Sequence, residues 1–193
     1  NFLLEWIPPL PYITEIRARS NGSAPRKFIE LAGLPQDLTG LSLVTIGSDP
    51  SGNSGIIRSI TDLAGSSISP LNYHVTAELG FVGGVVDLIV PQDSIGFEDD
   101  TNLTVLLVSD LAVIAGTDLD PDNDGTIDLS GWGQIVDSVS LLNSPLISQE
   151  NQPVSGPRIY SPRTVGPMGT EMPWMVERCP DQRDAFFAIG PPE

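Results

Sequence analysis

Short runs of apolar and β-branched residues alternate along this chain with turn-forming segments. Asp, Gly, Ser, Asn and Pro dominate the gaps, and no segment keeps a 3.6-residue apolar period for three turns. This pattern predicts an antiparallel β-sandwich or barrel. The expected strands are Tyr12–Ala18, Lys27–Gly33, Leu41–Ser48, Gly55–Ile60, Asn72–Ala77, Val85–Val90, Leu103–Ser109 and Gln134–Leu142.

The composition agrees with short strands joined by turns. The 193 residues include 19 glycines and 18 prolines, and only 18% are charged, which suits strands better than helices. This length suffices for one good core. We therefore expect a single domain over residues 12–190, whose irregular part, 146–193, closes the sheet edges through "PRIYS" and "PWMVERC".

The first eleven residues, "NFLLEWIPPLP", differ from the rest of the chain. They carry six large apolar side chains and three prolines, which forbid a helix through the second half. This arm, residues 1–11, is too short to form a core. It must pack either on its own domain or on a neighbouring copy, so a homo-oligomer built through the arm is one expectation.

The charge is strongly acidic and unevenly distributed. The formal net charge is −16, and no Lys or Arg occurs from Ser59 to Pro157. Such a surface repels phosphate backbones and anionic lipids, which argues against nucleic-acid binding and membrane association. The longest apolar run, Leu79 to Val90, is interrupted by Asp87 and by Gly83-Gly84, so no membrane-inserted segment is expected.

The segment "TDLDPDNDGTID", residues 117–128, contains five aspartates. Aligned on its glycine, it matches most of a calcium loop, because alternate carboxylates can point inward while Gly permits the sharp turn. Thr126 would contribute its backbone carbonyl. The predicted ligands are Asp118, Asp120, Asp122, Asp124, Thr126 and Asp128.

The match to a calcium loop is incomplete. Gly131 stands where an EF-hand needs a bidentate Glu, so a sixth ligand must come from elsewhere, with Asp118 and Asp137 as the candidates. The alternative is a solvated acidic loop without metal. Like charges a few ångströms apart repel by about 1 kcal/mol per pair even in water, which favours bound Ca²⁺. A second acidic group, Glu98, Asp99 and Asp100, suits turn chemistry better than a second cation site.

The sequence offers little for catalysis. His74 is the only histidine and lies in a strand pattern, Cys179 is the only cysteine, and no "GxSxG" or "GxxxxGK" motif is present. We expect no enzyme activity, a hydrogen-bonded structural His74, and a Cys179 that behaves as a small buried hydrophobe. Trp6, Trp132 and Trp174 could stack on sugar rings, although packing in a sandwich is the more common role of tryptophan.

The ordered set of strands and turns resembles the bacterial, secreted branch of the lamin tail domain family over about residues 12–190. The resemblance implies an immunoglobulin-like β-sandwich without catalytic residues, found in extracellular and cell-surface proteins, with an aspartate-rich insertion where Asp118 to Asp128 lie here. The apolar start and irregular end depart from this pattern. The pieces that carry the resemblance are "ITEIRA…KFIELAG", "DLTGLSLVTIG", "GIIRSITDLAGSSI", "FEDDTNLTVLLVS", "TDLDPDNDGTIDLSGWGQIVDSVSLL" and "GPMGTEMPWMVERCPD".

Together these observations predict an all-β, immunoglobulin-like antiparallel sandwich with long loops and extended termini. Its expected function is that of an extracellular or cell-surface module, stabilised by Ca²⁺, with a structural or adhesive role in an assembly or filament. The alternative is an accessory or carbohydrate-binding module of a secreted enzyme such as a nuclease.

Overall fold

The computed structural model describes residues 9–19, 27–97, 101–143 and 158–190, and these form β-strands and turns without a helix. All eight expected strands are present. The chain adds three more near its C-terminus. The strands are β1 (Tyr12–Arg17), β2 (Phe28–Ala32), β3 (Leu41–Gly47), β4 (Ile56–Asp62), β5 (Tyr73–Glu78), β6 (Leu88–Val90), β7 (Leu103–Ser109), β8 (Gln134–Leu141), β9 (Thr164–Val165), β10 (Met175–Cys179) and β11 (Phe186–Ile189).

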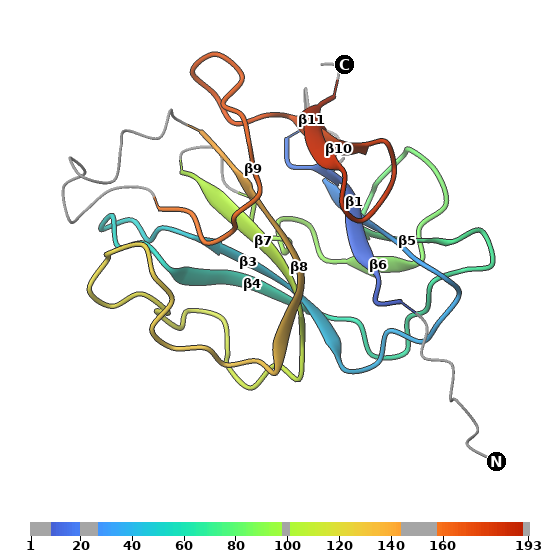
Figure 1. Ribbon diagram of the computed structural model, residues 1–193, viewed down its shortest axis with the longest axis horizontal. Coiled ribbons are helices and arrows are strands. Elements are labelled where there is room, and N and C mark those ends of the chain that lie inside the picture. The colour runs from blue at the N-terminus through green and yellow to red at the C-terminus, as the bar shows by residue number, and fades with distance from the viewer. Residues whose placement is uncertain (1–8, 20–26, 98–100, 144–157, 191–193) are drawn as a thin grey trace.

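The strands form two sheets (Figure 1). The six-stranded sheet has the order β11-β10-β1-β2-β5-β6, and the five-stranded sheet has the order β4-β3-β7-β8-β9. This arrangement confirms the all-β class and is consistent with the predicted sandwich. Of the two C-terminal pieces expected to pair, "PWMVERC" supplies β10, whereas the described part of "PRIYS", residues 158–161, lies outside the strands. No helix in the described residues could span a membrane.

The prediction of a purely antiparallel sandwich is wrong, because each sheet contains one parallel pair. β6 pairs in parallel with β5, and β9 pairs in parallel with β8. A parallel neighbour requires the chain to turn back before it pairs. The connection 79–87 makes this return between β5 and β6, and Phe81 in it packs edge-on against Phe28 of β2, with ring centroids 5.3 Å apart.

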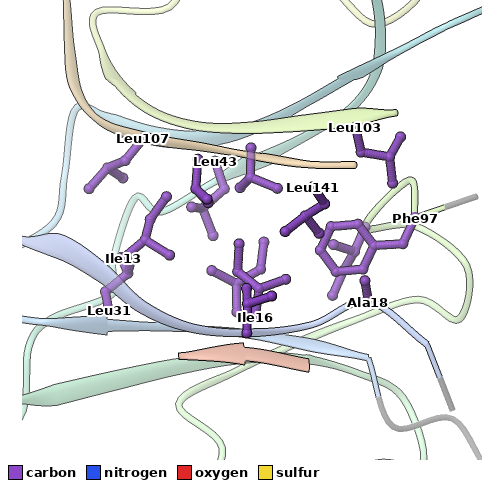
Figure 2. Packing of buried hydrophobic residues seen from close by; sticks show 14 of the residues in the cluster. Ile13, Ile16, Ala18, Leu31, Leu43, Phe97, Leu103, Leu107 and Leu141 are labelled. Atoms are coloured by element: carbon purple, nitrogen blue, oxygen red, sulfur yellow. The ribbon is translucent and has the colours of Figure 1, made fainter. Parts of the chain in front are cut away.

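The main core lies between the two sheets (Figure 2). Side chains from β1 and β2, such as Ile13 and Leu31, meet side chains from β3 and β7, such as Leu43 and Leu107. Fully burying one such side chain stabilises the fold by about 1.5–3 kcal/mol.

The opposite face of the five-stranded sheet is buried as well. Val44 and Ile46 of β3 and Leu106 of β7 belong to a second apolar cluster that includes Leu119, from the connection between β7 and β8. The run "LTVLLVS" is therefore apolar at nearly every position because both faces of β7 are covered. The connection 110–133 acts as the cover for this second core.

A buried ion pair joins the two sheets. Arg178 of β10 donates to Asp137 of β8, and the two residues are each 4% exposed. Asp137 also accepts the backbone N–H of Ile13 at 2.8 Å, and Arg178 stacks on Phe187 at 4.4 Å. A buried Arg or Asp without a partner of opposite charge destabilises the fold, so each of these residues depends on the other for its burial.

Candidate functional site

The aspartate-rich segment forms a tight loop in which three carboxylates converge. Oxygen atoms of Asp120, Asp122 and Asp124 lie within 4.8 Å of one another, so this cluster could hold a metal ion. Asp120 is fully buried, whereas Asp122 and Asp124 are exposed. The site is therefore open to solvent on one side and anchored in the protein on the other.

The backbone of the loop makes the sharp turn that the spacing of the aspartates around Gly125 predicts. Gly125 has φ +92° and Asn123 has φ +56°, a left-handed region that Gly and Asn tolerate. The N–H groups of Asp124 and Gly125 donate to the Asp120 carboxylate at 3.0 and 2.9 Å, and the N–H of Thr126 donates to Asp124 at 2.7 Å. These bonds aim the carboxylates. Oδ1 of Asp120 and Oδ1 of Asp124 each accept one of them and keep a second lone pair for a cation.

The buried member, Asp120, has one partner that sequence spacing did not reveal. The hydroxyl of Tyr160 donates to its Oδ2 at 2.7 Å. Burial and then this hydrogen bond raise the pKa of Tyr160 above its usual range, so the hydroxyl remains a proton donor. Tyr160 lies forty residues beyond Asp120 within "PRIYS", and no local signal marks it as part of the loop.

The loop is also tied to the start of β4. The N–H of Ser54 donates to the side chain of Asn123 at 2.6 Å, and the N–H of Leu119 donates to the carbonyl of Gly55 at 3.0 Å. Arg158 donates to the carbonyl of Asn123 at 3.1 Å. The ligand loop is thus connected to two segments distant in sequence.

Gly55 allows the closest of these approaches. Its φ is +81°, and a Cβ there would lie 2.7 Å from the Cβ of Asp120 and 3.1 Å from the Tyr160 hydroxyl. We expect Gly55→Ala to lower the free energy of unfolding by about 1–3 kcal/mol, because both the strained φ and the contact oppose it. Denaturant titration measures this, with Gly52→Ala as control, since Gly52 also has a positive φ but open space around it. An equal decrease in the free energy of unfolding for the two variants would contradict the close packing of Gly55 against Asp120.

The other predicted ligands lie around the cluster without completing it. Asp118 accepts the N–H of Asp120 at 3.0 Å, and Thr126 and Asp128 are exposed. Partial desolvation and the charges of Asp122, Asp124 and Asp120 raise the pKa of Asp128. Coordination by Asp118, Thr126 and Asp128 remains a prediction.

Asp137 does not fit the role of a further ligand. Arg178 and Arg163 both contact its carboxylate between the sheets, and Ile13 donates a backbone hydrogen bond to it. The second acidic group, Glu98 to Asp100, lies outside the described residues.

The described residues that were considered for catalysis and sugar binding make contacts within the fold. His74 is fully buried, with Nδ1 3.2 Å from the Ser67 carbonyl and Nε2 3.2 Å from the Thr76 hydroxyl, and burial lowers its pKa. Trp132 packs against the second core, and Arg19 stacks over Trp174 at 5.6 Å. Trp6 lies outside the described residues.

The environment of Cys179 differs from expectation. The sequence predicts a small buried hydrophobe, but the residue ends β10 and is exposed. The reason is register: Val176 and Arg178 of β10 face the interior, so Glu177 and Cys179 face outward.

A second charged region lies on the outer face of the six-stranded sheet. Glu15 of β1 pairs in register with Glu177 of β10 on one side and with Glu30 of β2 on the other. Like charges directly opposite one another destabilise a sheet. Burial, then Glu30 and Glu177, raise the pKa of Glu15 to about 7.

This raised pKa gives a prediction with a definite sign. The folded state takes up a proton near pH 7, whereas unfolded Glu15 does so near its ordinary value of 4.5. The contribution of Glu15 to stability therefore improves as pH falls from 8 to 5. We expect Glu15→Gln to stabilise the protein by about 1 kcal/mol at pH 8, an amount already reduced for solvent screening, and to confer no advantage at pH 5.

Thermal or denaturant unfolding of both proteins at each pH measures this difference. Glu171→Gln is a suitable control, because Glu171 is exposed and paired with Arg19 at 2.7 Å. Destabilisation by Glu15→Gln at pH 8 would show that the ionised carboxylate is favoured in the fold.

The fold and site together define a two-sheet β protein with a carboxylate cluster able to hold a cation. A scan against protein-family models matches no family, and searches of the curated proteins and of the solved structures return no match. The resemblance to lamin tail domains therefore rests on the sequence pieces alone.

Proposed function

We propose that this chain is a calcium-stabilised structural module. The observation that carries the proposal is the position of the carboxylate cluster: Asp120, Asp122 and Asp124 converge on the connection that covers the second core. A cation held there would reduce carboxylate repulsion and restrain the cover at the same time. The site's role is thus to stabilise the fold, and nothing in its geometry requires a reaction.

Calcium is the cation that suits this donor set best. All candidate ligands are carboxylate or carbonyl oxygens, which Ca²⁺ and Mg²⁺ prefer and softer metals do not. The irregular, partly exposed arrangement fits the flexible coordination of Ca²⁺ better than the strict octahedron of Mg²⁺. Water can complete the shell on the exposed side.

The cover explains how a cation would act on the molecule. Leu119 is fully buried in the second cluster, and Ile127 packs against that cluster, so both ends of the acidic loop insert apolar side chains beneath it. Repulsion among the carboxylates would loosen the loop and expose this cluster. Calcium binding would instead keep the outer face of β3 and β7 covered, in the manner of a local clamp.

We further propose an extracellular or cell-surface location. A partly exposed oxygen site of this kind matches the weak calcium sites of extracellular modules, whose dissociation constants are about 10⁻⁴–10⁻³ M. The immunoglobulin-like assignment and the relation to secreted lamin tail domains belong to the same proposal. They rest on strand order, turns and the position of the acidic insertion.

The apolar arm motivates the last part of the proposal, assembly with other copies. Six large apolar side chains in water would be a strong association signal. The described end of the arm is anchored on its own domain, because Gln36 donates to the Pro9 carbonyl at 3.0 Å and Arg183 donates to the Leu10 carbonyl at 2.8 Å. Deletion of residues 1–8 therefore leaves these anchors in place.

The mass of the native particle in calcium tests this part. We expect the full chain to form a larger particle by light scattering, and the chain without residues 1–8 to be monomeric. Phe2→Asp combined with Trp6→Asp should have the same effect as the deletion, whereas Glu5→Gln should have none. A monomeric full chain at high concentration, or an assembly that survives the deletion, would exclude the arm as the connector.

A further inference from the structure

The outer face of the six-stranded sheet carries a cavity of about 490 Å³, separate from the aspartate loop. Its floor is formed by β1, β2, β5 and β10, and its roof by the connection 79–87, which returns the chain to β6. Its volume is in the range of small-ligand sites, which are typically lined by apolar side chains with a few placed polar groups. The lining residues are Glu15, Arg17, Phe28, Glu30, Val75, Phe81, Val82, Gly83, Gly84, Val85 and Met175.

Strand register arranges the sheet face that carries the floor into two rows. One row carries Glu177, Glu15, Glu30 and Val75 on β10, β1, β2 and β5. The adjacent row carries Met175, Arg17, Phe28 and Ala77 on the same strands. The charged residues that line the cavity, Glu15, Arg17 and Glu30, therefore occupy the middle of the floor, and apolar side chains border them.

The roof is apolar and incompletely packed. Phe81 contacts the ring of Phe28 and closes one side. Val82 is 71% exposed and Val85 is 82% exposed, although both line the cavity. Gly83 and Gly84 lie between them and permit this turn. Two largely exposed valines beside a cavity leave apolar surface that a ligand could cover.

The floor has an excess of negative charge. The cavity lining holds two carboxylates, Glu15 and Glu30, and one guanidinium, that of Arg17. Glu177, the register partner of Glu15 on β10, lies outside the lining. The Thr14 hydroxyl donates to one oxygen of Glu30 at 2.8 Å. Carboxylates in register across neighbouring strands break the pairing preference of a sheet, and such local conflicts are expected mainly where function requires them.

A metal ion does not fit this floor. Among the described residues, the only group of three carboxylate, His or Cys ligands that converges within 4.8 Å is Asp120, Asp122 and Asp124. An organic cation needs no such convergence, because one ammonium group can donate to two carboxylates while its stem contacts the apolar walls. Aromatic rings such as those of Phe28 and Phe81 also favour a nearby cation.

We propose that this cavity binds a primary ammonium group on a short apolar stem, with Glu15 and Glu30 receiving the ammonium and Phe28, Phe81 and Val85 covering the stem. The same chemistry occurs in a free alkylamine and in the lysine side chain of a partner protein. This inference does not depend on the calcium site or on assembly through the arm.

Titration with hexylammonium at fixed calcium, followed by amide chemical shifts, tests the proposal. We expect saturable shifts at the lining residues, binding at least tenfold weaker for hexanol, and no binding of hexanoate. Nα-acetyl-lysine methylamide distinguishes the two sources: binding comparable to hexylammonium indicates a lysine of a partner, and much weaker binding indicates a free amine. Either result supports the site.

Variants distinguish the contribution of charge to hexylammonium binding from the contribution of apolar contact. Glu15→Gln with Glu30→Gln should weaken hexylammonium binding at least tenfold, while Asp62→Asn, an exposed carboxylate on β4, should leave it unchanged. Phe81→Ala should weaken hexylammonium more than methylammonium, because only the longer stem reaches the ring. Since the glutamine variants relieve repulsion, they are expected to fold, and unfolding curves confirm this independently.

The pH dependence provides a further check. The ammonium stays charged between pH 6 and 8, whereas Glu15 loses its proton as pH rises through about 7. The charged groups that act on Glu15 are Arg17, Glu30 and Glu177. On the roof connection, Asp87 accepts the N–H of Val75. Binding should therefore strengthen from pH 6 to pH 8. Equal binding of hexylammonium and hexanol, shifts confined to other surfaces, or equal weakening by Asp62→Asn would overturn the proposal.

Discussion

Asp137→Ala is expected to lower the free energy of unfolding by about 3–5 kcal/mol, the largest single effect we predict. The substitution leaves the Arg178 guanidinium buried without its carboxylate, and the cost of an uncompensated buried charge is of this size. It also removes the acceptor of the Ile13 N–H, which lies at the bulge between β1 and β2. Urea or guanidinium titration measures the change.

A double-mutant cycle shows whether the pair is the cause. Arg178→Met alone should also be strongly destabilising, because Arg178 donates to the carbonyls of Ile13, Arg183 and Ala185 as well as to Asp137. Asp137→Ala combined with Arg178→Met should cost clearly less than the sum of the two single changes. Strict additivity would mean that the two charges do not interact across the sheets.

Removal of calcium is the second large effect that we expect. With free calcium a hundredfold above the dissociation constant, binding to the folded state adds about 2.7 kcal/mol. For a chain of this length, that corresponds to a shift in melting temperature of about 5–11 °C. Chelation should therefore lower the melting temperature clearly, and magnesium at the same concentration should restore less of it than calcium.

A matched pair of variants assigns the effect to the loop. Asp120→Asn keeps the shape of the buried side chain but removes its charge, so it should abolish most of the calcium-dependent shift. Asp110→Asn lies in the same connection, is exposed and is outside the carboxylate cluster, so the shift should persist. An identical response to calcium in both variants, or no calcium by elemental analysis, would refute the site.

The central strands could be predicted because their signals are local. Apolar residues on both sides of the pleat in "LSLVTIG" and "LTVLLVS" indicate strands covered on both faces, as β3 and β7 are. The two short edge strands near the C-terminus escaped prediction. β9 has two residues and β11 has four, too few for a period, and their pairing depends on which neighbour the rest of the chain leaves open.

The candidate metal site also has one part that the sequence predicted and another part that it did not. The spacing of Asp120, Asp122 and Asp124 around Gly125 alone indicated that their carboxylates converge, because backbone geometry over six residues determines it. Tyr160, Arg158 and Gly55, which anchor the loop, come from distant segments and have no motif. The sequence also suggested Asp137 as a ligand, but the tertiary structure places it opposite Arg178.

What the sequence determined by itself was thus the all-β class, the main strands and the acidic loop, since these follow from periodicity and short-range turn geometry. The tertiary structure decided the parallel pairs, the interior ion pair and the cavity beneath the connection 79–87. These features depend on which distant residues face one another, and strand register across two sheets sets this in a way that local sequence does not encode.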